Sequence, residues 1–400
     1  MKRRLADLAV LGGAPLYQQK VHVGRPNLGD RDYFLSRLQS VLDSKWLTNN
    51  GPCVQELERE IADWLGVRHC ILVCNATIGL EVVIRGLDLR GEVIVPAMTF
   101  VASAHALQWQ HITPVFCDIE PETHLIDPKR VEELITPHTT GIMGVHLWGR
   151  VCDVDTLSAL ARRRGLALLF DAAHAFGCSR GGRLVGGFGR AEVFSFHATK
   201  FFNTFEGGAI TTNDDQLAQR LRLMINFGFA GFDNVVHIGT NAKMNEVCAA
   251  MGLASMRSLT DTIDTNRRNH GAYAQALSGI AGIRFLEHPV HEHGNFQYVV
   301  AEYDPPPGCL SRDQLIDVLW AENVIARRYF YPGCHRMEPY RTLYPDAGRR
   351  LPVTEAVAQR LVVLPTGNDI QAADVLAIAS AIRVAIEGGD ALTASLRGRS

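Results

Sequence analysis

The most informative part of this chain is the stretch Val193-Phe194-Ser195-Phe196-His197-Ala198-Thr199-Lys200, because an apolar run ends there in small and hydroxylated residues and then a lysine. A lysine in such a place can form a Schiff base with an aldehyde cofactor. Pyridoxal phosphate (PLP) requires an amine that can lose its charge, an anion site for its phosphate and a carboxylate for its pyridine nitrogen. The stretch therefore predicts Lys200 as the catalytic lysine of a PLP enzyme.

Asp171 is the candidate for the carboxylate. It follows the apolar run of residues 166–170 and begins the sequence Asp171-Ala172-Ala173-His174. A buried carboxylate is costly unless a cation meets it, and a protonated pyridine nitrogen is such a cation. Two alternatives stay open at this point: Asp171 could cap a following helix, and Lys200 could be an ordinary exposed lysine. The combination of the two residues predicts the catalytic pair.

The sequence Asn75-Ala76-Thr77 joins a predicted strand to a predicted helix. Backbone N–H groups and the positive end of the helix dipole would face an anion there. We therefore expect Ala76 and Thr77 to bind the phosphate, and Ser195, five residues before Lys200, to donate a further hydrogen bond. The alternative is that Asn75 or Thr77 only caps the helix.

The chain alternates short apolar runs with amphipathic segments, which predicts an α/β fold with a mostly parallel sheet and covering helices. A large domain is expected over residues 1–260, including an N-terminal segment, and a smaller α+β domain over 261–400. The final helix is expected at 372–387, and a loose tail at 391–400. The predicted strands are 71–74, 92–95, 114–117, 141–146, 166–170, 192–196 and 208–212, and the predicted helices before residue 260 include 54–65, 77–86, 101–110, 155–164 and 216–225.

Composition indicates an ordinary enzyme of 400 residues with a formal net charge of -2. That charge gives no electrostatic reason to expect nucleic acid or a membrane as partner. The nine cysteines are scattered without a C-x-x-C pair, which favours reduced thiols. No signal peptide and no apolar run of membrane-spanning length is present, so a cytoplasmic location is expected.

The chain resembles the DegT-type sugar-nucleotide aminotransferase family, a branch of the fold-type I PLP enzymes. The resemblance covers nearly the whole length and includes the phosphate turn, Asp171-Ala172-Ala173-His174-Ala175 and the lysine segment. The other blocks that carry it are Trp46-Leu47-Thr48-Asn49-Asn50-Gly51-Pro52, Val95-Pro96-Ala97-Met98-Thr99-Phe100, Val145-His146-Leu147-Trp148-Gly149, Glu206-Gly207-Gly208, Gly239-Thr240-Asn241-Ala242-Lys243-Met244-Asn245-Glu246 and Leu364-Pro365-Thr366-Gly367.

The resemblance implies roles for three further residues near the cofactor. Phe100 matches an aromatic residue that stacks on the pyridine ring, and His174 matches a position near the phenolic oxygen. For Phe100, an ordinary core phenylalanine is an equally good explanation on sequence grounds alone. For His174, a buried histidine with satisfied hydrogen bonds is the alternative, and the cofactor contact is favoured. Asn241 matches a residue that reaches the phosphate from the neighbouring subunit, which implies a homodimer with shared active sites.

The resemblance also implies the reaction. L-Glutamate would donate its amino group, and the acceptor would be the keto group of a nucleotide-linked deoxysugar, with dTDP-4-keto-6-deoxyglucose as the first choice. Lys200 would move the protons and Asp171 would keep the pyridine nitrogen protonated. The sugar-nucleotide cleft would include Thr48, Arg327, Tyr331 and His335. Exposed arginines are common, so an ordinary surface arginine is the alternative for Arg327. The sequence around Gly333-Cys334 also differs from the usual family sequence.

Several alternatives remain. A PLP-dependent sugar dehydratase shares the fold, but that branch has histidine in place of the lysine, so Lys200 favours aminotransfer. A 3-keto-sugar aminotransferase and a non-catalytic regulator on the same scaffold are the others. His288, His291 and His293 lack a carboxylate or cysteine partner at ligand spacing, so no metal site is predicted.

Overall fold

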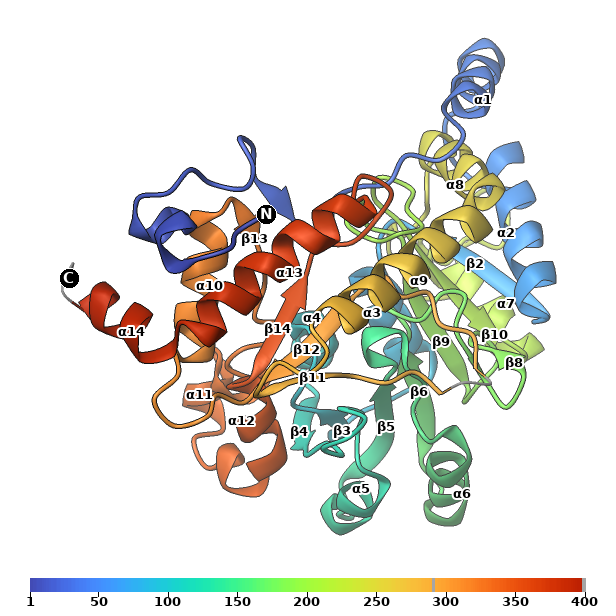
Figure 1. Cartoon of the computed structure of the whole chain (residues 1–400). Helices are drawn as coiled ribbons and strands as arrows, with labels where there is room; N and C mark the ends of the chain where they lie inside the picture. The colour runs from blue at the N-terminus through green and yellow to red at the C-terminus, as the bar shows by residue number, and fades with distance from the viewer. Residues whose placement is uncertain (290–291, 398–400) are drawn as a thin grey trace.

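The structure is a computed structural model of the chain and describes residues 1–289 and 292–397. Within that part, seven strands form a central sheet in the order β2-β10-β9-β6-β5-β3-β4 (Figure 1). The pairs are parallel except the two that β10 makes, because no helix crosses over between β9 and β10. The strands are β2 His69–Val73, β3 Glu92–Pro96, β4 Thr113–Cys117, β5 Thr139–Val145, β6 Ala167–Asp171, β9 Ala191–Ser195 and β10 Gly208–Thr212.

Apolar side chains alternate along the strands and build one core on each face of the sheet. In β2, Cys70 and Leu72 belong to the first core, and Ile71 and Val73 belong to the second. Helices α2, α6 and α8 cover the first core, whereas α3, α4 and α7 cover the second. Their bounds are α2 Pro52–Leu65, α3 Ala76–Gly86, α4 Val101–Gln108, α6 Val154–Arg164, α7 Asp215–Met224 and α8 Glu246–Arg257.

A smaller unit follows α8 in the sequence and has a third core of its own. Its sheet consists of three antiparallel strands, β11 Ile283–Phe285, β12 Val299–Tyr303 and β14 Leu361–Leu364. The main helices packed on this core are α9 Leu259–Ala276, α10 Arg312–Ala321 and α13 Ala372–Glu387. The predicted fold, a mostly parallel α/β sheet with a smaller α+β unit, is confirmed.

The N-terminal segment packs on the smaller unit, in contrast to its expected place in the large domain. Strand β1 Val21–His22 pairs in parallel with β13 Val324–Ile325. Leu8 is fully buried in the third core, and Lys2 Nζ lies 2.9 Å from Glu322 Oε2. In Figure 1 this blue segment lies beside α10. The division at residue 260 stays a prediction, but we propose to count residues 1–22 with the smaller unit, because Leu8 is buried in its core and β1 pairs with β13.

Residues 389–397 are helical, so the prediction of a loose tail is wrong for residues 391–397. Helix α14 Gly389–Arg397 follows α13 closely, and its Leu392 is fully buried in the third core. Residues 398–400 lie outside the described part of the chain. Burial of Leu392 in the third core anchors this segment to the smaller unit.

The remaining elements connect these layers. They are α1 Arg31–Ser44, α5 Pro128–Leu134, α11 Tyr340–Leu343, α12 Pro352–Ala358, the hairpin of β7 Ser179–Arg180 with β8 Arg183–Leu184, and the 3-10 turns Leu5–Asp7, Ala9–Leu11, Leu147–Gly149, Cys334–Arg336 and Ala347–Arg350. None of the helices in the described part of the chain combines the length and apolar character that crossing a membrane requires.

Candidate active site

The residues predicted to hold the cofactor follow strands that end at one edge of the sheet. Strands β2, β3, β6 and β9 run in the same direction, because β2 and β9 are both antiparallel to β10 and the others are linked by parallel pairs. Ligands of open α/β sheets bind at the carboxyl ends of the strands. The residues concerned are Ala76 and Thr77 after β2, Phe100 after β3, Asp171 and His174 at and after the end of β6, and Ser195 and Lys200 at and after the end of β9.

Lys200 lies in a turn after β9, where its backbone N–H donates to the carbonyl of His197 at 2.8 Å. Its Nζ donates a hydrogen bond to the hydroxyl of Tyr298 at 3.1 Å. Burial lowers the pKa of Lys200 from 10.5 to about 8, although the negative charge of Asp171 opposes this shift. With this pKa, about half of the Lys200 amines are neutral near pH 8, and the neutral amine can act as nucleophile and base.

We expect Lys200 to react with an amine-specific reagent at an unusually low pH. Because burial holds its pKa at about 8, labelling of the cofactor-free protein should be half-maximal near pH 8. An unperturbed lysine requires a pH roughly two units higher. Labelling at a series of pH values, read by peptide mass spectrometry, measures this. If Lys200 in the folded protein reacts no earlier than the same lysine in the unfolded chain, burial does not tune its amine.

Asp171 is 6% exposed and held by two donors. Ser103 donates its hydroxyl to Oδ2 at 2.7 Å, and the N–H of Ala173 donates to Oδ1 at 3.0 Å. Burial raises the pKa of Asp171, whereas these hydrogen bonds and the charge of Lys200 oppose the rise. Turns rather than a helix follow Asp171, so the helix-cap alternative is wrong. The carboxylate is thus fixed in place and would be stabilised by a cation.

Aromatic rings form a wall beside Lys200. The His174 ring centroid lies 4.4 Å from that of Tyr298, and Trp148 stacks on Phe330 at 5.4 Å. Burial lowers the pKa of His174 well below its usual value, so this imidazole is neutral. Trp148 Nε1 is buried and has no hydrogen-bond partner among the described residues. A buried donor without a partner, in the same wall as the lysine, is a group that a ligand would satisfy.

Phe100 is 58% exposed, although it follows a buried strand. Its ring centroid lies 6.0 Å from that of Phe330, at the end of the aromatic wall. The alternative of an ordinary core phenylalanine is therefore wrong. An exposed ring at this edge of the sheet offers a stacking surface for a planar ligand, worth about 1 kcal/mol beyond burial.

The turn after β2 has the geometry of an anion site. Asn75 caps α3 by accepting from the N–H of Ile78 at 2.9 Å, so the capping alternative holds for Asn75. Ala76 and Thr77 form the first turn of α3, where backbone N–H groups lack partners within the helix. A Cβ at Gly208 would lie 2.9 Å from the nitrogen of Ala76, so only glycine lets the backbone of β10 approach this closely. Ser195 pairs with Gly208 across the sheet and ends beside this turn.

The predicted substrate residues are only partly brought together. Arg327 is exposed and lies over the ring of Tyr329 at 4.8 Å, next to the aromatic wall, and Thr48 is exposed. Arg328 lies 5.2 Å from the ring centroid of Tyr331. His335 is 2% exposed, and its Nε2 lies 2.8 Å from Glu355 Oε1. Their roles stay predictions, and the structure places His335 where it packs against neighbouring side chains instead.

Asn241 is exposed in the segment between α7 and α8. The next residue, Ala242, accepts from the N–H of Cys74 at 2.7 Å, so the segment is anchored beside the predicted phosphate turn. Its predicted contact with a neighbouring subunit stays a prediction.

Three residues of the site were missed from sequence: Ser103, Trp148 and Tyr298. Ser103 lies inside α4 and Tyr298 next to β12, and neither has a local sequence signal. Trp148 belongs to one of the blocks that carry the family resemblance, and a positive φ of 61° sets its backbone apart from ordinary residues. That block could have indicated Trp148, whereas the other two required the tertiary structure.

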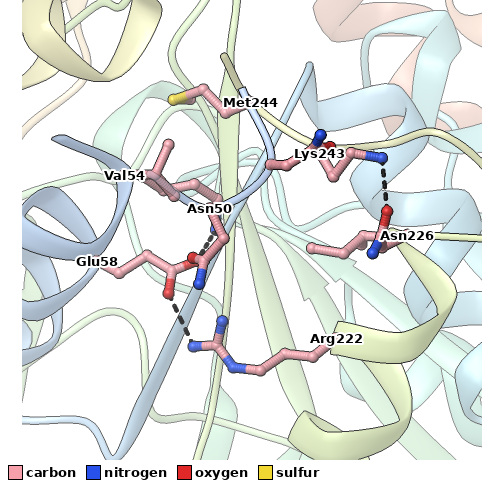
Figure 2. Close-up of a pocket in the computed structure, with 10 residues that line it drawn as sticks. Asn50, Val54, Glu58, Arg222, Asn226, Lys243 and Met244 are labelled. Atoms are coloured by element: carbon pink, nitrogen blue, oxygen red, sulfur yellow. Dashed lines mark hydrogen bonds and ion pairs between the residues drawn. The ribbon is translucent and has the colours of Figure 1, made fainter. Parts of the chain in front are cut away.

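A pocket of about 210 Å³ lies at the edge strand β2, between α2 and α7 (Figure 2). Glu58 and Arg222 form an ion pair at 2.9 Å in it, and Lys243 Nζ donates to Asn226 at 2.8 Å. Lys200 and Asp171 do not line it. Because both of its cations already have partners, we assign no chemistry to this pocket.

Among residues 1–289 and 292–397, no cluster of three or more histidine, cysteine, aspartate or glutamate side chains could hold a metal ion. His291, one of the three histidines considered from sequence, lies outside the described residues.

The pattern of the DegT/DnrJ/EryC1/StrS aminotransferase family matches residues 30–383. The chain belongs to this family. Membership confirms the resemblance noted from the sequence blocks, and it makes the protein an aminotransferase.

Similar proteins of the family share almost the whole chain. A dTDP-4-amino-4,6-dideoxy-D-glucose transaminase of Shigella dysenteriae is 38% identical over 92% of this chain and 99% of its own. GDP-perosamine synthase of Caulobacter vibrioides is 34% identical over 91% and 97%. A crystal structure of DesI in the presence of its TDP-sugar product is 47% identical and covers 99% and 100%, with a TM-score of 0.92. The chain is thus similar to sugar aminotransferases over both of its units.

Proposed function

We propose that the protein is a PLP-dependent aminotransferase that moves the amino group of L-glutamate to the keto group of a nucleotide-linked deoxysugar, dTDP-4-keto-6-deoxyglucose, in amino-sugar biosynthesis. One observation carries the proposal. Lys200, with its lowered pKa, lies at the same sheet edge as the buried carboxylate of Asp171, with an anion-binding turn beside them.

The donor set fits PLP. The first-turn N–H groups of Ala76 and Thr77, with Ser195, would hold the phosphate. Phe100 would stack on the ring, and Asp171 would meet the pyridine nitrogen. Lys200 would bind the aldehyde carbon. Bound in this way, PLP would supply the electron sink that lets a carbon next to nitrogen lose its proton.

The protein side chains would then control where protons go. Lys200 Nζ would remove the proton from the α carbon of glutamate and would later deliver a proton to the sugar carbon that receives the amine. Asp171 would stay ionised because the ring nitrogen provides the cation that it lacks. His174, neutral at working pH, would act as a hydrogen-bonding partner rather than as a charge.

The substrate follows from the relatives' names and from the predicted cleft. The Shigella relative and DesI are named for dTDP or TDP sugars, whereas the Caulobacter relative is named for a GDP sugar. The more similar two therefore favour dTDP. We propose that Thr48, Arg327, Tyr331 and His335 line the sugar-nucleotide cleft, with the guanidinium of Arg327 near the diphosphate. For His335 this requires Glu355 to release its ring.

The deciding experiment uses the purified protein, PLP and L-glutamate with dTDP-4-keto-6-deoxyglucose, its 3-keto isomer and the GDP-linked 4-keto sugar in parallel. Mass spectrometry of the sugar nucleotide should show replacement of the keto oxygen by an amine with the dTDP-4-keto substrate first. Amination of the 3-keto isomer alone would favour the alternative position. Loss of oxygen without gain of nitrogen would favour the dehydratase, and no product with any sugar would favour the regulator.

We also propose a homodimer with shared sites and a cytoplasmic enzyme. Exposed apolar side chains gather in the segment that ends at Asn241, which supports an interface there. They are Phe227 at 47%, Phe229 at 40%, Val235 at 59%, Val236 at 55% and Ile238 at 73% exposure. Apolar side chains grouped in this way are typical of a protein interface.

Mixed dimers are expected to show that Asn241 acts across the interface. Chains with Asn241→Ala and chains with Lys200→Ala should each be impaired as homodimers. In the mixed dimer, one site carries both changes and the other carries neither, so up to half of the wild-type activity per dimer should return. Activity of separately tagged, co-purified mixed dimers measures this. Activity no higher than that of Asn241→Ala alone would mean that Asn241 serves its own subunit.

A further inference from the structure

Tyr298 connects the smaller unit to the lysine of the large sheet. It immediately precedes β12, yet its hydroxyl accepts the hydrogen bond of Lys200 Nζ at 3.1 Å, across a sequence separation of 98 residues. Among the described residues, this is the one side-chain hydrogen bond that either group makes. The position of the lysine amine therefore depends on a residue of the other unit.

The surroundings of Tyr298 keep its hydroxyl protonated and in one place. The residue is 8% exposed, and its ring packs against His174 at 4.4 Å, Trp148 at 5.5 Å and Tyr329 at 6.2 Å. Burial raises the pKa of Tyr298 above its ordinary value of 10, so the phenol does not ionise at working pH. The hydroxyl of a neutral phenol can both accept and donate a hydrogen bond.

We propose that Tyr298 is the positioning residue of Lys200 in aminotransfer. Its oxygen accepts from Lys200 when the amine is protonated, and its O–H donates to the nitrogen lone pair when the amine is neutral. One hydroxyl thus holds Nζ in the same place before and after each proton transfer, with no gain or loss of a proton by the phenol. Since Tyr298 belongs to the smaller unit, the placement of that unit on the large sheet determines where the Nζ of Lys200 lies.

This proposal rests on the proposed function, in which Lys200 moves the protons. A simpler role exists for the ring of Tyr298, which fills the wall between His174 and Trp148. The two roles separate in Tyr298→Phe, because phenylalanine keeps the ring and removes only the hydroxyl. A hydrogen bond to a charged donor is stronger than one to a neutral donor, so losing the hydroxyl disfavours the ammonium form of Lys200 more than the neutral amine.

The first measurement uses the protein without cofactor and reads the pH at which Lys200 is half-labelled by an amine-specific reagent. In Tyr298→Phe this midpoint should fall by on the order of half to one pH unit. The control is Tyr303→Phe, since Tyr303 is a fully buried tyrosine of β12 whose hydroxyl donates to the carbonyl of Leu310 at 3.0 Å. That variant should leave the midpoint of Lys200 unchanged.

The second measurement follows transfer from glutamate to the loaded enzyme in a single turnover. Tyr298→Phe should lower the maximal rate at least tenfold at an unchanged half-saturating glutamate concentration, and 3-fluorotyrosine at position 298, which keeps a hydroxyl, should restore most of it. An unchanged labelling midpoint together with an unchanged rate would overturn the positioning role. If Tyr298→Phe is unstable, 3-fluorotyrosine at position 298 decides the same point through the labelling midpoint, because fluorine makes the hydroxyl a weaker acceptor for Lys200 Nζ and the midpoint should then fall. An unchanged midpoint in the fluorotyrosine protein would overturn the positioning role. Failure of the proposed function would show differently, as a wild-type enzyme that transfers no amino group while the labelling midpoint still responds to Tyr298→Phe.

Discussion

Replacing Lys200 with alanine is expected to lower the rate of amino transfer by a factor on the order of 10⁴, without loss of the fold. A methyl group cannot bind the cofactor carbon or carry the proton. Because burial of the lysine's charge costs free energy, its removal should leave the thermal unfolding midpoint unchanged or raise it. Steady-state turnover with glutamate and the keto sugar nucleotide measures the rate, and thermal unfolding of the same samples measures the fold.

Lys129→Ala is the matched control, since Lys129 is an exposed lysine in α5. It should leave both measurements unchanged. Borohydride reduction of the PLP-loaded wild-type enzyme, followed by peptide mapping, should place the cofactor on the peptide that contains Lys200. Turnover by Lys200→Ala above about a hundredth of the wild-type rate, or a label on any other lysine, would contradict the assignment.

Asp171→Asn is expected to fold normally and to lose activity by a factor on the order of 10³. The amide oxygen can still accept from Ala173, but a neutral side chain cannot keep the pyridine nitrogen protonated. In the cofactor-free protein, burial raises the pKa of Asp171, so its ionised form costs stability at neutral pH, and this cost disappears as the pH falls from the raised pKa towards 3.8. Asp171→Asn removes the cost at neutral pH, and its unfolding midpoint should not lie below that of the wild type.

A second buried carboxylate provides the comparison. Asp118 is 2% exposed and accepts from the N–H groups of Val353 and Thr354 at 3.0 and 2.8 Å and from the hydroxyl of Thr354 at 2.7 Å. Asp118→Asn should lower the unfolding midpoint by weakening these bonds, while the turnover per folded molecule stays near that of the wild type. Equal loss of activity in both variants would mean that burial, rather than contact with the ring nitrogen, explains the effect at Asp171.

Much of the fold could be predicted, because its elements depend on local patterns. The predicted strands and helices of the large sheet agree with the structure to within two residues at each end. The bounds of these strands and helices follow from short apolar runs, amphipathic segments and the polar residues between them. These patterns depend only on residues that are neighbours in the chain. The direction of β10 was not predicted, since it depends on a connection without a helix.

The structure departs from the expectations where the packing of distant segments decides the outcome. The N-terminal segment has no pattern that says which unit it packs on, and Leu8 and Leu392 both find the third core only in the folded chain. The role of His335 in the cleft stays a prediction, and its contact with Glu355 depends on residues that its own segment does not reveal. In each case the position of a side chain depends on its packing against residues that are far away in the sequence.

Local sequence patterns were enough to predict the family features: the lysine and the aspartate after their strands, the turn with free N–H groups, and the order of these blocks along the chain. The groups that surround these features became visible only in the folded chain. Ser103 reaches Asp171 across 68 residues and Tyr298 reaches Lys200 across 98. The physical reason is that strand ends and helix starts depend on neighbouring residues in the chain. The pKa and the position of a buried amine instead depend on distant side chains, which the packing of the two units brings within hydrogen-bond distance.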